Sequence, residues 1–209
     1  MSAEVNAMHA AIRNSEWDEC TVRYDHGPRL HYVYRRGPGE QCFSPWLVVA
    51  PSALLVSVGA HDKGLYAARS FAEGQLIGMY NGRVVGHYTS REEALDAPET
   101  QRLARSGADK LVTVRPSQGG GVDLIDGSHG TIPYVHLCND PHRTRRTPNC
   151  ELTPGGYLRA LRRIPAFDLG RPLDDGKNRR AELLICYGDD FWLLFDRLGQ
   201  SRGHPIELD

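Results

Sequence analysis

Residues 136–150 read HLCNDPHRTRRTPNC, and residues 181–192 read AELLICYGDDFW. The first stretch is rich in Asn, Asp and Pro, which are typical turn residues. The second is an apolar run that ends at Tyr187-Gly188, as a buried strand followed by a turn would. Each stretch alone fits such an ordinary structural role. Their order along the chain, with a third segment upstream, says more.

The upstream segment, residues 63–82, reads KGLYAARSFAEGQLIGMYNG. Asn81-Gly82 after an apolar run is a strong signal for a tight turn. Short apolar runs at 30–34, 46–49 and 53–58 indicate further strands separated by turns. Many short strands with few helices predict a mainly β fold built from several small sheets.

Other segments are assigned by pattern. Thr89 or Ser90 offers an N-cap, and Pro98 interrupts the helical pattern that follows. The remaining expectations are helices at 2–14, 89–106 and 191–198, strands at 122–125, 157–161 and 181–187, and a polar loop at 165–180.

Composition excludes several classes of protein. The chain has 209 residues, 40% hydrophobic and 24% charged, which is typical of a soluble globular domain. We find neither a secretory signal nor a membrane span in the sequence, so we expect an intracellular protein. The net charge of −1 is atypical of proteins whose main role is binding phosphate backbones. The five cysteines form no CxxC pair, so neither a disulfide framework nor a metal site is expected.

In this order, the three segments resemble the SET-domain family of protein lysine methyltransferases. That family has a Gly-bounded first turn and hairpin, an Asn-His stretch ahead of Pro-Asn-Cys, and a C-terminal Glu-Leu run ending in Tyr-Gly. The likeness covers roughly residues 59–192 and implies a SET-like fold with a knot-like C-terminal crossing. It implies a flanking region at 1–55, a catalytic domain at 56–192 with an insert at about 83–122, and a C-terminal segment at 193–209 without zinc-binding cysteines.

The resemblance also implies roles for single residues. Tyr187 corresponds to the catalytic tyrosine, Tyr80 to the tyrosine of the lysine channel, and Phe191 to the aromatic residue that sets the product. We expect Asn139 and Tyr187 to lie near each other. The expected contacts with S-adenosylmethionine involve Lys63, Gly64, Leu65, Tyr66, His136, Leu137, Asn139, Asp140 and Tyr187.

Four positions depart from the family pattern. Asp62 stands where the first glycine of the turn is usual, Asp140 replaces the usual histidine, and His136-Leu137 replaces Arg-Phe. Phe191 instead of tyrosine leaves room for an added methyl group, so the resemblance implies di- or trimethylation. By family analogy we expect a histone tail as substrate and the nucleus as location.

Three alternatives stay open. The departures allow a catalytically inactive SET-like module that binds a peptide or the cofactor. Metal-dependent hydrolysis would need ligands among His129, His136, Asp140 and His142, which lack the helical HExxH spacing. Arginines between 143 and 180 could bind nucleic acid, but without an aromatic stacking pattern a solvated face or a docking patch near chromatin is favoured.

Overall fold

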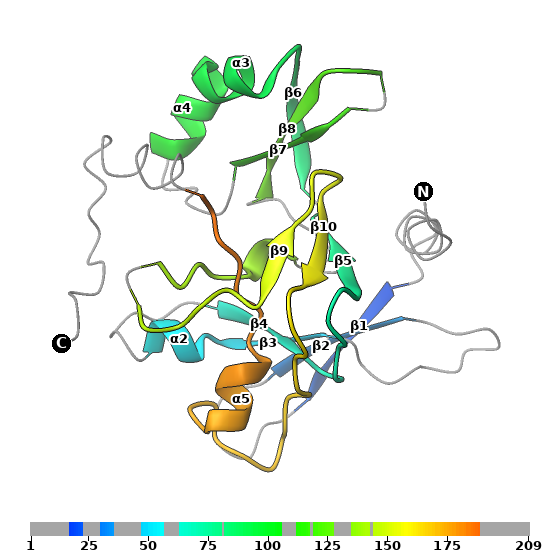
Figure 1. Ribbon diagram of the computed structural model, residues 1–209, viewed down its shortest axis with the longest axis vertical. Helices are drawn as coiled ribbons and strands as arrows, with labels where there is room; N and C mark the ends of the chain where they lie inside the picture. The colour runs from blue at the N-terminus through cyan, green and yellow to red at the C-terminus, as the bar shows by residue number, and fades with distance from the viewer. Residues whose placement is uncertain are drawn as a thin grey trace.

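The computed structural model describes residues 17–22, 30–35, 47–56, 63–80, 82–105, 112–117, 119–127, 135–142 and 144–188. These residues form three small antiparallel sheets with a few short helices (Figure 1). The expectation of a mainly β fold is therefore confirmed. The helix expected at 2–14, the helix expected at 191–198, and the residues Asp62 and Phe191 lie outside the described residues.

The first sheet has four strands in sequence order. Its two C-terminal strands are buried along almost their whole length, which explains their continuous apolar sequence. Leu47 lies opposite Ala67, and Pro51 lies opposite Lys63 at the other end of the pair. The strands are β1 (Trp17–Val22), β2 (Leu30–Arg35), β3 (Leu47–Pro51) and β4 (Lys63–Ala67).

The second sheet has the order β5-β10-β9. Its strands are β5 (Leu76–Met79), β9 (Cys150–Leu152) and β10 (Tyr157–Ala160). A hairpin joins β9 to β10, and Gly156 adopts a positive φ of 79° in its turn. The backbone carbonyl of Gly156 accepts from the N–H of Tyr80 at 2.7 Å, which ties the end of β5 to this hairpin.

The third sheet and two helices form a separate layer at one end of the molecule (Figure 1). Its strands are β6 (Arg83–Tyr88), β8 (Val122–Asp126) and β7 (Val112–Pro116), and its helices are α3 (Arg91–Asp96) and α4 (Pro98–Arg105). Gly121 enters β8 with φ of 70°, and a Cβ there would lie 2.2 Å from the carbonyl oxygen of Tyr88. Only glycine fits this close approach.

The helical expectation at 89–106 is confirmed with the break at Pro98. The Ser90 hydroxyl accepts from the N–H of Glu93, which caps α3. Pro98 is the first residue of α4, a position where its missing N–H costs no hydrogen bond. No helix in the described part of the chain has the length and apolar character that crossing a bilayer requires.

One large apolar cluster joins the first two sheets. It includes Leu47 and Leu65 from the first sheet and Ile77 and Leu158 from the second, all fully buried. The half-buried Tyr187 packs against the same cluster. The large apolar core therefore extends to the last described segment of the chain, which carries Tyr187.

Three local expectations are wrong. Residues 53–58 were expected as a strand, but Ala53–Val56 form helix α2, whose first turn is capped by the Ser52 hydroxyl. The polar loop at 165–180 contains helix α5 (Gly176–Ala181), capped by Asp175. Residues 181–187 make only isolated bridges at Glu182 and Leu184 instead of a regular strand.

Candidate active site

The three segments singled out in the sequence meet in space. The side-chain amide of Asn139 donates to the carbonyl oxygen of Lys63 at 3.0 Å. The backbone of Asn139 forms a parallel bridge with Leu184, and its carbonyl accepts from the N–H of Ile185 at 3.0 Å. Asn139 thus links the first segment to the last.

Tyr187 is held from two directions. Its phenol donates to the carbonyl oxygen of Cys138 at 2.7 Å, and its backbone N–H donates to Oδ2 of Asp140 at 2.7 Å. The next residue, Gly188, has φ of 87°, which favours glycine at this turn. The tyrosine is therefore fixed beside residues 138–140, as expected from the sequence.

Asp140 organises its own loop. Its Oδ1 accepts from the N–H of His142 at 2.8 Å, while Oδ2 accepts from Tyr187. A carboxylate can accept both bonds at once, and such charge-assisted bonds are stronger than neutral ones. Asp140 thus links the loop directly to Tyr187.

Glu182 is a fully buried carboxylate beneath the site. Its side chain accepts from the Ser52 hydroxyl at 2.5 Å, the Leu54 N–H at 3.0 Å and the Arg146 guanidinium at 2.7 Å. A buried charge needs such partners because leaving water is costly. Glu182 therefore joins α2, the second segment and the third.

Asn149, within Pro-Asn-Cys, replaces the missing strand partner of the third segment. Its Oδ1 accepts from the N–H of Leu184 at 2.8 Å, and its Nδ2 donates to the carbonyl of Glu182 at 2.7 Å. These bonds satisfy backbone groups that a neighbouring strand would otherwise pair. The Pro-Asn-Cys motif thus positions the segment that leads to Tyr187.

Tyr80 and the nearby thiols are buried. Tyr80 is 1% exposed, and burial raises the pKa of its phenol well above the ordinary value, with further contributions from Asp126 and Cys138. Burial also raises the pKa of the Cys138 and Cys150 thiols. The phenol therefore stays protonated, and neither thiol supplies a thiolate nucleophile.

The other expected cofactor residues differ in exposure. Lys63 is exposed, Leu137 is half-buried, and His136 and Gly64 are buried. Leu65 is fully buried, and its carbonyl accepts from the N–H of Leu183 at 2.7 Å. Side-chain access to a ligand is thus open at Lys63 and Leu137.

Tyr66 lies inside the first sheet. Its side chain is fully buried, and its phenol donates to the carbonyl of Pro51 and accepts from the N–H of Ala53, both at 2.7 Å. The ring packs edge-on against Phe167, with centroids 5.3 Å apart. Its phenol thus serves the fold, so any cofactor contact here falls to the backbone.

The residues present fit S-adenosylmethionine in their chemistry. That cofactor carries a carboxylate, an ammonium group and an aromatic base, so its site needs a cation, oxygen acceptors and apolar surface. Lys63 is exposed, and Asn139 and Asp140 are half-buried, which keeps these polar side chains accessible. Leu137 adds apolar surface at the same place.

Sequence reasoning missed Ser52, Arg146 and Glu182 as a connected group. An acid inside the apolar run 181–185 was the available signal, since a buried carboxylate must find partners. Within the described ranges, no three His, Cys, Asp or Glu side chains gather as metal ligands would. His129, one of the residues considered for a metal, lies outside those ranges.

No known family model matches the chain, and no curated protein matches it. Solved structures that match include the Chaetomium thermophilum Polycomb Repressive Complex 2 bound to GSK126, with 18% identity over 74% of this chain and 17% of that chain, at a TM-score of 0.42. Another is ctPRC2 in an autoinhibited conformation bound to S-adenosylmethionine. Its identity is 21% over 74% of this chain and 16% of that chain, at a TM-score of 0.39.

A third match is the Neurospora SET domain protein DIM-5, a histone lysine methyltransferase. Its identity is 17% over 61% of this chain and 48% of that chain, at a TM-score of 0.34. The chain thus spans about a sixth of the matched chains of the Polycomb complex and about half of DIM-5.

Proposed function

We propose that the protein is an S-adenosylmethionine-dependent methyltransferase that acts on the side-chain amine of a protein lysine. The observation that carries the proposal is the meeting of three motifs, quoted from the sequence, at Asn139 and Tyr187. The Asn139 amide contacts Lys63 of the first motif, and the Tyr187 phenol contacts Cys138 of the second. These contacts support a site in which the methyl donor and the lysine side chain would meet.

The residues of the chain have roles that suit this reaction. The cofactor, when bound, supplies an electrophilic methyl group on a sulfonium. A lysine amine attacks only when neutral, and its ordinary pKa of about 10.4 keeps it charged in neutral water. An apolar channel lowers that pKa by desolvation. In this proposal buried Tyr80 and half-buried Tyr187 would provide the aromatic walls that admit the cation first.

Positioning supplies the rest of the catalysis. Phenol hydroxyls at Tyr80 and Tyr187 would orient the amine lone pair, and backbone carbonyls would hold the methyl group through weak C–H contacts. Correct alignment of two reactants contributes about 7–11 kcal/mol. The raised pKa of Tyr80 keeps its phenol neutral, which fits orientation and does not fit general-base catalysis. No strong base is needed in this scheme.

The finer assignments follow from the resemblance. We propose a histone tail as substrate, di- or trimethyl-lysine as product because of Phe191, and a nuclear location. The cofactor residues remain those given above, with the SET-like domain at 56–192.

Labelled S-adenosylmethionine tests the proposal directly. The protein is incubated with the labelled cofactor and a panel of histones and cell extract, and the methylated residue is mapped by mass spectrometry. Label on a lysine side chain is expected. The absence of both label transfer and cofactor binding by calorimetry would overturn the enzymatic assignment.

The alternative is an inactive SET-like module, favoured by Asp62, by Asp140 and by His136-Leu137 in place of the family residues. Cofactor or peptide binding without methyl transfer would select it.

A further inference from the structure

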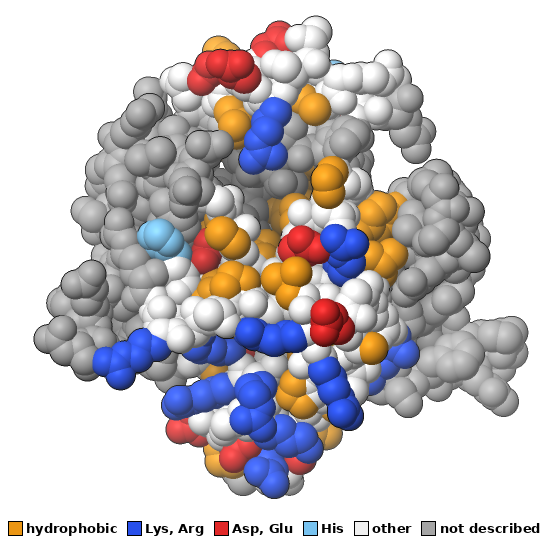
Figure 2. All heavy atoms as spheres, viewed as in Figure 1, with side chains coloured by type: hydrophobic (Ala, Val, Ile, Leu, Met, Phe, Trp, Pro, Cys, Tyr) orange, Lys and Arg blue, Asp and Glu red, His pale blue; other side chains and the backbone are white. Residues whose placement is uncertain are grey.

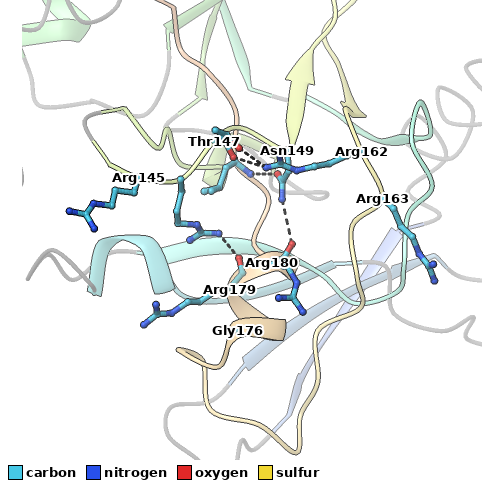
Figure 3. Close-up of a pocket in the computed structure, with 10 residues that line it drawn as sticks. Arg145, Thr147, Asn149, Arg162, Arg163, Gly176, Arg179 and Arg180 are labelled. Atoms are coloured by element: carbon cyan, nitrogen blue, oxygen red, sulfur yellow. Dashed lines mark hydrogen bonds between the residues drawn. The ribbon is translucent and has the colours of Figure 1, made fainter. Parts of the chain in front are cut away.

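A groove of about 590 Å³ lies beside the candidate site and is lined mainly by arginines. It is formed by residues from three separate parts of the chain, each of which contributes a pair of adjacent arginines (Figure 3). The six are Arg145, Arg146, Arg162, Arg163, Arg179 and Arg180. In the space-filling view, Lys and Arg side chains form a band across the lower half of this face (Figure 2).

Two of the six arginines are fixed by the protein. Arg146 is bound by the buried carboxylate of Glu182, and Arg162 donates to the carbonyl and the hydroxyl of Thr147, each at 2.9 Å. The remaining four, at 145, 163, 179 and 180, are exposed. The groove thus has a fixed base and exposed charged walls.

Two of the acids near the groove already pair with basic side chains, while Asp174 is exposed. Asp168 pairs with Lys177 at 2.9 Å, and Asp175 pairs with Arg171 at 3.4 Å. Among the described residues, no carboxylate lies within ion-pair distance of Arg163, Arg179 or Arg180. The positive charge of these arginines is therefore available to an external anion.

The lining also tells what kind of anion fits. Of the described lining residues none is aromatic, and Leu184 is the one large apolar side chain. Stacking of single-stranded bases needs aromatic rings, and a peptide needs apolar or aromatic anchors. Contacts to the backbone of a duplex need only charge, and guanidinium groups bind phosphates in bidentate fashion.

We propose that this arginine groove binds the phosphate backbone of double-stranded nucleic acid, without reading its sequence. The sequence favoured a solvated face for these arginines because no aromatic stacking pattern accompanies them. The fold concentrates six of them at one place. The proposal does not depend on the methyltransferase activity, since no residue of the groove is assigned a catalytic role.

The test uses the full chain and a fluorescent DNA duplex of about 20 base pairs, followed by anisotropy at several salt concentrations. A Kd of about 10⁻⁶ to 10⁻⁴ M at physiological salt is expected, with equal affinity for two unrelated sequences. The variant R163Q/R180Q removes two positive charges from the groove and should weaken duplex binding about tenfold or more. The slope of the logarithm of the binding constant against the logarithm of the salt concentration should become less steep by roughly 1–2. The control R91Q/R102Q removes two exposed charges of α3 and α4 and should leave binding nearly unchanged.

Each other outcome counts against the proposal. Equal losses in both variants would mean that overall charge alone attracts DNA. Tighter binding of the single strand would indicate base contacts. Binding of poly-glutamate, lost in R163Q/R180Q while duplex binding is absent, would assign the groove to an acidic polypeptide. Circular dichroism and Tm of both variants must equal those of the parent, and a groove variant that unfolds is replaced by R179Q/R180Q.

Discussion

The amide of Asn139 donates to the carbonyl oxygen of Lys63, 76 residues earlier in the chain. The same residue carries the parallel bridge to Leu184, so it is bonded to both flanking segments of the site. A small polar residue is needed here because an apolar side chain could not bond the Lys63 carbonyl.

Tyr187→Phe tests catalysis. The variant loses one hydrogen bond to the Cys138 carbonyl, a stability cost of about 0.5–1.5 kcal/mol. Methyl transfer should fall by about 10²–10³ because a preorganised polar group is lost, while peptide binding by anisotropy stays the same. The matched control is Tyr88→Phe in the third sheet, which removes an exposed hydrogen bond to Glu99 of α4 and should keep full activity. Retained turnover in Tyr187→Phe would remove Tyr187 from the mechanism.

Phe191→Tyr tests the product. An added hydroxyl would hold water where a further methyl must go, so the variant should shift products toward monomethyl-lysine. Intact-mass analysis of a methylated peptide measures the distribution. An unchanged distribution would mean that position 191 does not control the product.

Glu182→Ala tests the buried carboxylate. It removes the acceptor of the Arg146 guanidinium, the Ser52 hydroxyl and the Leu54 N–H. The free energy of unfolding, measured with urea, should therefore fall by about 3–5 kcal/mol. Glu151→Ala, at an exposed pair with Arg159, should cost at most about 1 kcal/mol. Equal effects of the two substitutions would contradict the role given to Glu182.

Three glycines form a graded series. Gly119→Ala has open space and no positive φ, so its effect should be small; Gly74→Ala adds strain at φ of 76°. Gly121→Ala adds a clash with the Tyr88 carbonyl to strain at φ of 70° and should be the most destabilising of the three. Melting temperatures measure the order, and a Gly121 variant as stable as the Gly119 variant would contradict it.

Acid stability tests Asp168. The hydrogen bond from Lys177 lowers the pKa of this carboxyl, helped by the N–H of Gly170. Because the folded pKa lies below the unfolded value of about 3.9, the stabilisation is complete above that pH and is lost as pH falls through the folded pKa. The difference in Tm between the parent and Asp168→Asn should therefore shrink steadily as the pH falls below about 3.9. A difference that stays constant over that range would assign the effect to shape and not to charge.

Local signals sufficed for several elements. Ser90 marks the start of α3 and Pro98 marks the start of α4, because caps and prolines act on neighbours within a few residues. The position of Tyr187 beside Cys138 and Asp140 was expected from the resemblance and not from any local pattern.

Contacts between residues far apart in the sequence explain the predictions that were wrong. Residues 53–58 have an apolar pattern that fits a strand, but the N–H of Leu54 is bonded by Glu182, 128 residues away. Likewise, the Asn149 side chain takes the place of a strand beside Leu184. The sequence named these arginines as possible nucleic-acid contacts but did not show that they line one groove, because the three pairs lie far apart in the sequence. Ser52 ahead of an apolar run was a helix-capping signal that could have been used.

The position of Glu182 has a consequence for biosynthesis. As the chain leaves the ribosome, Ser52 and Arg146 emerge long before the carboxylate that binds them. Until residue 182 follows, the Arg146 guanidinium and the N–H of Leu54 lack the carboxylate that accepts from them in the folded protein. The site is thus assembled last, and a chain stalled short of this point should be degraded or held by chaperones.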